Sequence, residues 1–194
     1  MNNIILMIVA YLLGSFPSAL VIGKTFYQKD IRNYGSGNLG STNAFRVLGK
    51  KGGAVVFILD ILKGGLALLI ATYGGATISP LIIAVFALIG HIYPIFANFK
   101  GGKAVATSAG IILFYSPVLF AILFIIFVST LKIWKMVSLS STIISIAAVF
   151  IVWFGNYDLT AQIMFSIFAA LIIIKHIPNY KRILNGTENK VSFL

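Results

Sequence analysis

The sequence contains no cysteine and only 4 acidic residues among 194. Without cysteine, the chain has no disulfide, no thiolate nucleophile and no Cys-ligated zinc or iron–sulfur site. So few carboxylates also exclude a carboxylate-rich metal cage. Charged residues make up 10% of the chain, whereas soluble domains are about one-quarter charged. We therefore expect neither a soluble globular fold nor a resident metal ion.

Apolar side chains and positive charge are abundant instead. Apolar and aromatic residues make up 59% of the chain, and 15 Lys or Arg give a formal net charge of +11. The mean hydropathy is +1.01. This combination favours helices in lipid, with basic loops facing anionic headgroups or an anionic substrate. We expect membrane lipid as a partner and no nucleic acid.

Several apolar runs are long enough to cross a hydrocarbon core, which needs roughly 20 helical residues. No basic residue precedes the run at residues 4–22, so it is not expected to be a cleaved secretory signal. The run at residues 104–131 is too long for one straight helix and contains Ser116-Pro117, which predicts one kinked helix or two short ones. The runs cover residues 4–22, 54–73, 80–99, 104–131, 137–154 and 159–174.

The distribution of basic residues decides between these two alternatives. If the chain turns near residues 115–117, there are seven spans, and every Lys and Arg except Lys63 lies on one side of the membrane. With six spans, the basic residues cannot all lie inside. We therefore predict an all-α bundle of seven transmembrane helices, with the N-terminus outside and the C-terminus cytoplasmic. No linker divides the chain, so residues 1–194 are expected to form a single membrane-embedded domain.

This topology gathers three polar segments on one face of the membrane. The first has a G-x-G-x-x-G spacing at residues 35–40, but a membrane helix precedes it where a dinucleotide site needs a strand, so nucleotide binding is not expected. Its glycines still let backbone amides approach an anion. Ser41-Thr42 is expected to cap a short helix toward Gly49, with Arg46 on its first turns. A flexible connector explains the glycines equally well but leaves Arg46 unexplained.

The second polar segment contains Gly101-Gly102-Lys103 at the start of the fourth span. A complete Walker A motif is missing, because Ala104 stands where Ser or Thr is needed, so ATP use is not supported. Two glycines and a lysine that lead into a helix nevertheless predict a phosphate cradle of backbone amides, helix dipole and ammonium. For Lys100 and Lys103 taken singly, snorkelling to headgroups is the alternative.

The third polar segment follows the last span. His176 and Asn179 are three residues apart, so they share a helix face. Pro178 is expected to end or bend that helix. A single His is more often a satisfied interfacial residue, but beside a basic cluster a neutral imidazole could orient or deprotonate a hydroxyl.

Two polar features lie inside the spans. Asp60 and Lys63 are three residues apart, so they can pair and offset much of the cost of two charges in lipid. We expect a structural pair rather than a proton path. For His91, within the third span, we expect a buried hydrogen bond rather than catalysis.

Taken together, the three segments resemble the bacterial acyl-phosphate:glycerol-3-phosphate acyltransferases, integral membrane enzymes of phospholipid synthesis. The resemblance covers nearly the whole chain and includes Asp60-x-x-Lys63-Gly64. It implies seven helices and an active site on the cytoplasmic face of the bacterial inner membrane. The implied reaction transfers a fatty acyl group from acyl phosphate to the 1-hydroxyl of sn-glycerol 3-phosphate, without a cofactor. The products are lysophosphatidic acid and phosphate. The motifs are GSGNxGxTNxxR (35–46), GHxxPxFxxFKGGKxVAT (90–107) and HxxNxxRxxxGxE (176–188).

Both implied substrates carry a phosphate, which requires two anion sites. We hypothesise that Arg46, Ser36 and Lys103 clamp the phosphate of glycerol 3-phosphate. The glycine pair before Lys103, with Thr107 and Ser108, is expected to hold the acyl phosphate and to stabilise charge at the reacting centre.

His176, oriented with Asn179, is expected to position the acceptor hydroxyl. Because phosphate is a good leaving group, the leaving phosphate could accept the proton in place of His176. The candidate residues are His176 and Asn179 as catalytic groups, and Ser36, Asn38, Asn43, Arg46, Lys100, Gly101, Gly102, Lys103, Thr107, Ser108, Arg182 and Glu188 as substrate-binding groups, with no metal ligand.

Other functions stay open at this point. A CoA-dependent membrane acyltransferase could use the same acceptor, but the His-x-x-x-x-Asp arrangement of many such enzymes is absent after both His91 and His176. A transporter of phosphate-containing anions is the non-enzyme alternative, although no charged path crosses to the outer loops. A membrane scaffold with basic loops would leave His176 and Asn179 unexplained. The oligomeric state is open, a monomer included.

Overall fold

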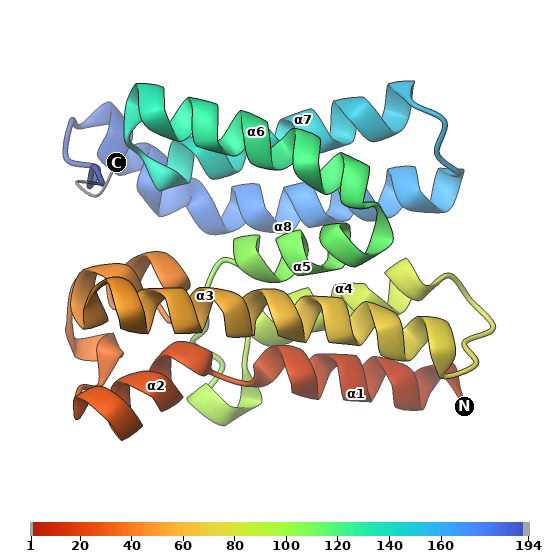
Figure 1. Cartoon of the computed structure of the whole chain (residues 1–194), viewed down its shortest axis with the longest axis horizontal. Helices are drawn as coiled ribbons and strands as arrows, with labels where there is room; N and C mark the ends of the chain where they lie inside the picture. The colour runs from red at the N-terminus through yellow and green to blue at the C-terminus, as the bar shows by residue number, and fades with distance from the viewer. Residues whose placement is uncertain (1, 192–194) are drawn as a thin grey trace. The chain divides into compact units, whose positions relative to one another are not determined.

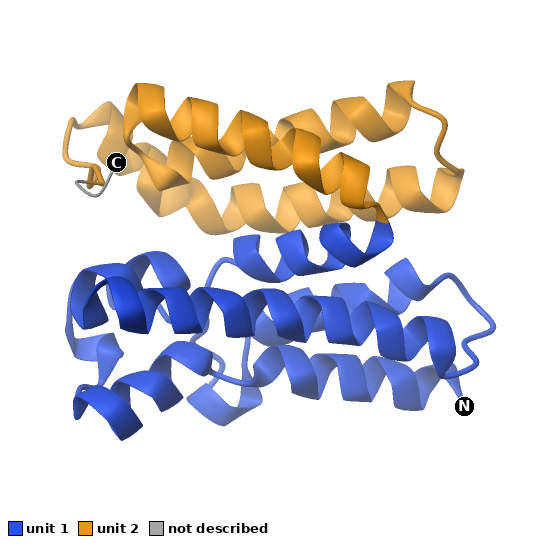
Figure 2. Ribbon diagram, in the orientation of Figure 1, with its two compact units in different colours: residues 1–115 blue, residues 116–194 orange. Residues whose placement is uncertain are grey.

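The computed structural model describes residues 2–191, which form helices and connecting loops without a β-strand. Two compact units divide the chain, residues 1–115 and residues 116–194 (Figure 2). Unit 1 contains α1 (Asn3–Ser15), α2 (Ser18–Tyr27), the 3-10 turn η1 (Ile31–Asn33), α3 (Ser41–Tyr73), α4 (Pro80–Ile92), the 3-10 turn η2 (Ile95–Ala97) and α5 (Val105–Tyr115). Unit 2 contains α6 (Pro117–Trp134), α7 (Val137–Phe154) and α8 (Leu159–Leu184).

Within the described residues, six helical segments are long and apolar enough to cross a membrane, and α5 is a shorter apolar helix of 11 residues. The prediction of an all-α, multi-span membrane protein is therefore confirmed. Seven spans would require α5, which is roughly 16 Å long, to count as one of them. The number seven and the orientation of the termini stay predictions.

The long apolar run is divided into two helices at Ser116. Pro117 occupies the first turn of α6, where a missing N–H removes no hydrogen bond. The Ser116 hydroxyl accepts a hydrogen bond from the Leu119 amide at 3.3 Å. The two-helix alternative is therefore confirmed, and the break coincides with the boundary between the units.

The first apolar run is also broken, which the hydropathy pattern did not predict. α1 ends at Ser15 and α2 begins at Ser18. Pro17 lacks an N–H and restricts the backbone of Phe16, so a continuous helix is disfavoured there. The break leaves the Phe16 carbonyl and the Ser18 hydroxyl inside the unit, where both are bonded by residues of α3.

In unit 1, α3 packs against α1, α4 and α5, and α1 packs against α4 (Figure 1). Glycines allow the close approaches. A Cβ at Gly64 would overlap the Thr107 carbonyl, and a Cβ at Gly110 would overlap the Ile61 carbonyl. Small residues at such crossings let membrane helices pack backbone to backbone. α5 is consequently fixed against α3 along its length.

The two ends of unit 1 carry different segments. At one end, Asn3 exchanges two hydrogen bonds with Thr77, at 2.7 and 3.0 Å, which tie the N-terminus to the loop between α3 and α4. At the other end, Leu39, Ala44 and Ala97 belong to one buried apolar cluster. The first two polar segments therefore lie together at one end of this unit, as predicted.

Unit 2 is a bundle in which α7 packs against both α6 and α8. The Val191 amide donates to the Lys135 carbonyl at 2.8 Å, so the chain after α8 returns to the turn between α6 and α7. Lys132 and Lys135 thus lie at the same end of the unit as the basic residues that close α8. This placement agrees with the charge distribution that favoured separate helices α5 and α6.

Candidate active site

The first polar segment is a loop folded around the side chain of Asn43. Its Oδ1 accepts from the Ser36 amide at 2.9 Å, and its Nδ2 donates to the carbonyls of Ile31, Tyr34 and Asn38 at 3.1–3.3 Å. Asn43 is 2% exposed. Its amide therefore has backbone partners on both sides and holds the loop in shape.

The turn before this loop is fixed by charge. Asp30 caps η1 by accepting from the Arg32 amide, and its carboxylate also pairs with the Arg32 guanidinium at 2.6 Å. The hydrogen bond from the Arg32 side chain holds the pKa of Asp30 well below its usual range, with a further contribution from Lys24. Arg32 is thereby occupied by an internal partner.

Arg46 projects from the short first part of α3. The helix begins at Ser41, and a left-handed backbone at Gly49, with φ +75°, separates this part from the long membrane segment. The expected short helix toward Gly49 is therefore present, and Arg46 is exposed on it. The expected cap is wrong: Gly40 is the N-cap residue and no side chain caps the helix, because Ser41 already lies in the first turn.

Replacing Asn43 with Ala is expected to loosen this loop and to destabilise the protein. The change leaves several buried backbone groups without partners, and each such group costs about 1–3 kcal/mol. We expect a lower thermal unfolding temperature in detergent and a raised KM for glycerol 3-phosphate. Asn43→Asp, which retains the acceptor for Ser36 but not the three donated bonds, should be intermediate. Unchanged stability and KM in Asn43→Ala would contradict the loop-holding role.

The second polar segment differs from the expected cradle. The Gly101 amide donates to the Ile92 carbonyl at 3.2 Å, and the Gly102 amide donates to the His91 carbonyl at 3.0 Å. These two amides therefore satisfy the C-terminal carbonyls of α4 and do not point to a ligand. The expectation that both glycine amides cradle a phosphate is wrong, because tertiary contact with α4 takes them first.

The neighbouring groups of this segment also have defined positions. Lys100 is exposed and Lys103 is half-buried. α5 begins at Val105, one residue later than a direct Gly-Gly-Lys entry would give. The Thr107 hydroxyl lies 3.0 Å from His91 Nδ1, and the Ser108 hydroxyl donates to the Val105 carbonyl at 2.8 Å. The buried hydrogen bond predicted for His91 is confirmed.

His176 and Asn179 lie on one buried face of α8, with 2% and 6% exposed surface. Pro178 does not end the helix, which continues to Leu184. His176 Nδ1 lies 2.8 Å from the Ile172 carbonyl. Because a carbonyl oxygen only accepts, this bond places the proton on Nδ1. In the neutral ring, Nε2 then carries the lone pair, as a general base requires.

Glu188 joins the residues of the third polar segment. Its carboxylate accepts from Asn179 Nδ2 at 2.7 Å, Arg182 Nε at 2.8 Å and the Ser138 hydroxyl at 2.7 Å. Burial raises the pKa of Glu188, but the three hydrogen bonds together outweigh this effect and hold the pKa below 4.5. Glu188 thus ties Asn179 to α7 as an ionised carboxylate.

Replacing Glu188 with Gln should destabilise unit 2 by about 1–3 kcal/mol at neutral pH, because charged hydrogen bonds to buried partners are lost. Since the folded-state pKa is lowered, this stabilisation is present above pH 4.5 and is lost as the pH falls through the folded-state pKa. Thermal unfolding between pH 7 and pH 3 should therefore show a gap between wild type and Glu188→Gln that closes at low pH. A gap independent of pH would contradict the ionised state of Glu188.

The structure adds serines on α7 that the sequence analysis passed over. Ser138 bonds Glu188, and Ser141, one turn later, is fully buried with no hydrogen-bond partner for its hydroxyl. Their three-residue spacing on an otherwise apolar helix was a usable signal, because it places both hydroxyls on one face. In the first segment, Asn38 Oδ1 is likewise a buried acceptor without a partner.

The sequence-predicted residues therefore gather as two groups, one in each unit. Ser36, Asn38, Asn43 and Arg46 lie at the same end of unit 1 as the segment from Lys100 to Ser108. The remaining group in unit 2 contains His176, Asn179, Arg182 and Glu188. Among the described residues, no three His, Asp or Glu side chains are grouped to hold a metal ion.

Comparison with known proteins agrees with these motifs. Residues 4–186 match the family model described as glycerol-3-phosphate acyltransferase. A relative named glycerol-3-phosphate acyltransferase 2 from Bacillus anthracis is 51% identical, over 97% of this chain and 99% of its own length. A glycerol-3-phosphate acyltransferase from Listeria monocytogenes is 48% identical, over 100% of this chain and 98% of its own length.

Solved structures give the same assignment. A crystal structure of PlsY (YgiH), described as an integral membrane glycerol 3-phosphate acyltransferase in its glycerol 3-phosphate form, matches with a TM-score of 0.92 and 38% identity, over 98% of this chain and 96% of that one. The lysophosphatidic acid form matches with a TM-score of 0.89 and 36% identity, over 98% and 95%. The protein therefore belongs to the glycerol-3-phosphate acyltransferase family of integral membrane enzymes.

Proposed function

We propose that this enzyme transfers a fatty acyl group from an acyl phosphate to the sn-1 hydroxyl of glycerol 3-phosphate, giving lysophosphatidic acid and inorganic phosphate. The observation that carries the proposal is the family match across both units, which covers the first two polar segments and the third as far as Gly186. The relatives' names and the glycerol 3-phosphate form of PlsY support the acceptor. The acyl phosphate donor follows from the motif resemblance.

We assign the acceptor phosphate to Arg46, Ser36 and Lys103. A guanidinium can hold two phosphate oxygens at once, whereas an ammonium acts as a point charge. Exposure of Arg46 on the short helix before Gly49 supports this assignment. Asn43 is assigned an indirect role, because its side chain bonds the loop backbone and not a ligand. Asn38 Oδ1, an acceptor without a protein partner, suits a substrate hydroxyl.

The acyl phosphate is assigned to Lys100, Lys103 and the N-terminus of α5. With the Gly101 and Gly102 amides bonded to α4, the positive charge comes from the lysine side chains and from the helix dipole. The glycines contribute by letting the loop pack directly on α4. Thr107 and Ser108 lie in the first turn of α5 and are buried, so they support this N-terminus from inside the unit.

In the reaction, the acceptor oxygen attacks the acyl carbonyl carbon, an ester bond forms, and the bond to the phosphate oxygen breaks. The hydroxyl proton passes either to His176 Nε2 or to the departing phosphate. The Nδ1 proton is bound to the Ile172 carbonyl, which supports His176 as the group that accepts the hydroxyl proton at Nε2 or orients the hydroxyl. Asn179 on the same face of α8 donates to Glu188, whose carboxylate also accepts from Arg182. No acyl-enzyme and no cofactor are required.

We also propose that the two units act as one domain, residues 1–194, in a bacterial inner membrane. Seven spans, counting α5, place the N-terminus outside and the C-terminus in the cytoplasm, with the reaction on the cytoplasmic side. Basic residues at the polar end of unit 1 and at the Lys135 end of unit 2 support this orientation, because basic loops favour the cytoplasm.

The direct test is reconstitution of the purified chain in liposomes with glycerol 3-phosphate and one acyl donor at a time. We expect lysophosphatidic acid and phosphate from acyl phosphate, and no product from acyl-CoA. If product forms from acyl-CoA and not from acyl phosphate, the donor is acyl-CoA and the proposed donor is wrong. Uptake of glycerol 3-phosphate into the liposomes without acylation would contradict the enzyme assignment and favour a carrier.

A further inference from the structure

Helices of unit 1 meet at the carboxylate of Asp60, deep inside α3. Its Oδ1 accepts from Lys63 Nζ at 2.7 Å and from the Ser18 hydroxyl at 3.0 Å, and His91 Nδ1 lies 3.7 Å away. Lys63 Nζ also donates to the Phe16 carbonyl at 3.2 Å. Asp60 and Lys63 are 1% and 7% exposed. The expected ion pair is therefore present. It also bonds Phe16 and Ser18, the residues at the break between α1 and α2.

This network reaches the glycine–lysine loop through His91. The His91 ring packs against Gly102 so closely that a Cβ there would overlap Nε2. The Gly102 amide bonds the His91 carbonyl, and Thr107 at the start of α5 bonds His91 Nδ1. One residue of α4 thus connects the Asp60 carboxylate with both ends of the loop that carries Lys103.

The backbone on either side of that loop is strained. Asn98, Phe99 and Ala104 have φ of +52°, +58° and +60°, a region that disfavours side chains. Such residues are unfavourable and persist only where the surrounding structure holds them. The loop therefore depends on its hydrogen bonds and ring contact with α4, and the position of His91 matters for its shape.

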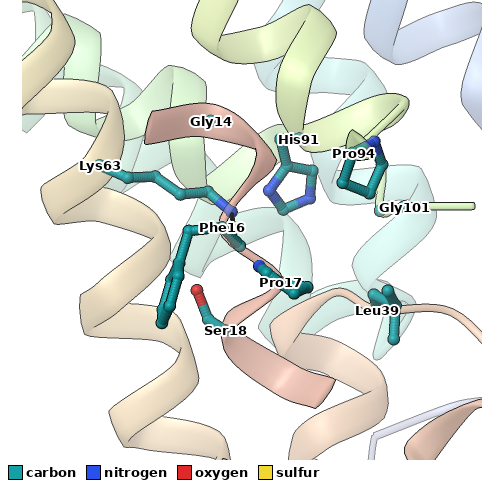
Figure 3. A pocket seen from close by; sticks show the side chains of 10 residues that line it. Gly14, Phe16, Pro17, Ser18, Leu39, Lys63, His91, Pro94 and Gly101 are labelled. Carbon is teal, nitrogen blue, oxygen red and sulfur yellow. Dashed lines mark hydrogen bonds between the residues drawn. The ribbon is translucent and has the colours of Figure 1, made fainter. Parts of the chain in front are cut away.

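A pocket lies at the same junction (Figure 3). Lys63 extends from α3 toward Phe16 and Pro17, while the His91 ring enters from α4. Ser18, Gly101 and Gly102 also line the pocket. Lys63 thus borders the same pocket as the loop glycines, whereas Asp60 lies behind it and is 1% exposed. If the pair served only to neutralise two charges in lipid, the contact between Asp60 and Lys63 would be sufficient by itself.

We propose that Asp60 and Lys63 are positioning residues for the loop from Lys100 to Lys103. Together they bond Ser18 and the Phe16 carbonyl, and the Asp60 carboxylate lies 3.7 Å from the His91 ring, which in turn holds Gly102 and Thr107. The pair acts on the reaction through the placement of Lys100 and Lys103, and the kinetic part of this inference rests on the proposed function.

The test replaces the pair with apolar residues of similar size, Asp60→Leu with Lys63→Met. Exchanging a buried ion pair for apolar residues is often neutral or stabilising. We therefore expect an unfolding temperature equal to or above that of wild type, together with at least a tenfold loss in kcat/KM for acyl phosphate. Asn3→Ala, which breaks the bonds to Thr77 at the other end of the unit, is the control and should keep wild-type kinetics. A stable double variant with wild-type kcat/KM would overturn the proposal.

A milder variant covers the case in which the double variant does not fold. Ser18→Ala removes one bond to Asp60 and leaves the ion pair in place. We expect a folded protein with a modestly lowered unfolding temperature and at least a threefold loss in kcat/KM, whereas Asn3→Ala keeps wild-type kinetics. Wild-type kcat/KM in Ser18→Ala would then overturn the proposal.

Loop position can also be measured without activity, which separates this inference from the proposed function. The chain has no cysteine, so Lys100→Cys provides a single site for a maleimide. We expect labelling at that site to become several-fold faster when Ser18→Ala or the double variant is added, and to be unchanged by Asn3→Ala. Equal labelling rates in all backgrounds would overturn the proposal. Absence of lysophosphatidic acid formation by wild type would instead count against the proposed function.

Discussion

Replacing His176 with Ala is expected to lower kcat by about 100- to 10,000-fold, the range associated with a positioned acid or base. His176 is buried on α8, and its Nδ1 proton is held by the Ile172 carbonyl. Nε2 is therefore presented in one orientation to any group on that face. Because the effect lies on the chemical step, KM for glycerol 3-phosphate should change little.

The measurement is steady-state formation of lysophosphatidic acid in liposomes, with both substrates varied. Ile174→Ala, an exposed position on the same helix, is the matched control and should retain activity. A loss of less than about tenfold in His176→Ala would place the proton transfer on the leaving phosphate and contradict an essential role for His176. An equal loss in both variants would indicate damage to α8 instead.

Replacing Arg46 with Lys is expected to raise KM for glycerol 3-phosphate by about 10- to 100-fold, although the charge is retained. A guanidinium makes two parallel hydrogen bonds to a phosphate, and a hydrogen bond to a charged group contributes about 1.5–3 kcal/mol. Lysine cannot reproduce that geometry. Arg46 is exposed beside a loop that Asn43 holds in shape, so its guanidinium is accessible to a phosphate at that loop.

Arg32→Lys is the control for this prediction. The Arg32 guanidinium pairs with Asp30 at 2.6 Å, so the exchange changes an arginine of the turn just before this segment without touching the proposed phosphate site. KM for glycerol 3-phosphate should stay near the wild-type value. Arg46→Lys with unchanged KM would remove Arg46 from the phosphate clamp.

The parts of the fold that local physics determines were predictable. Apolar length gave the helices, and Pro117 after a serine gave the break between α5 and α6. The three-residue spacing of Asp60 and Lys63 gave their ion pair, because neighbours on a helix face are forced together in lipid. The grouping of the first two polar segments followed from the order of the spans.

The features that depend on the path of the loops were not predictable. Glycine amides that suit an anion equally suit the end of a helix, and only the fold assigns Gly101 and Gly102 to the carbonyls of α4. Asn43, expected to bind substrate, instead has four backbone partners. Pro178 was expected to end or bend α8, and the prediction that the helix ends there is wrong, because α8 continues to Leu184. In both loops the partners are set by the path of the backbone, which the motif alone does not specify.

The central claim is that the residues of the two units act on one pair of substrates from the same side of the membrane. Single cysteines at Lys50, beyond Arg46, and at Asn189, beyond His176, test it with a membrane-impermeant maleimide applied to sealed vesicles of known orientation. The account predicts that both positions label only from the cytoplasmic side, while a cysteine at Tyr157 labels only from the other. Labelling of positions 50 and 189 from opposite sides would contradict it, because Arg46 and His176 could then share no substrate.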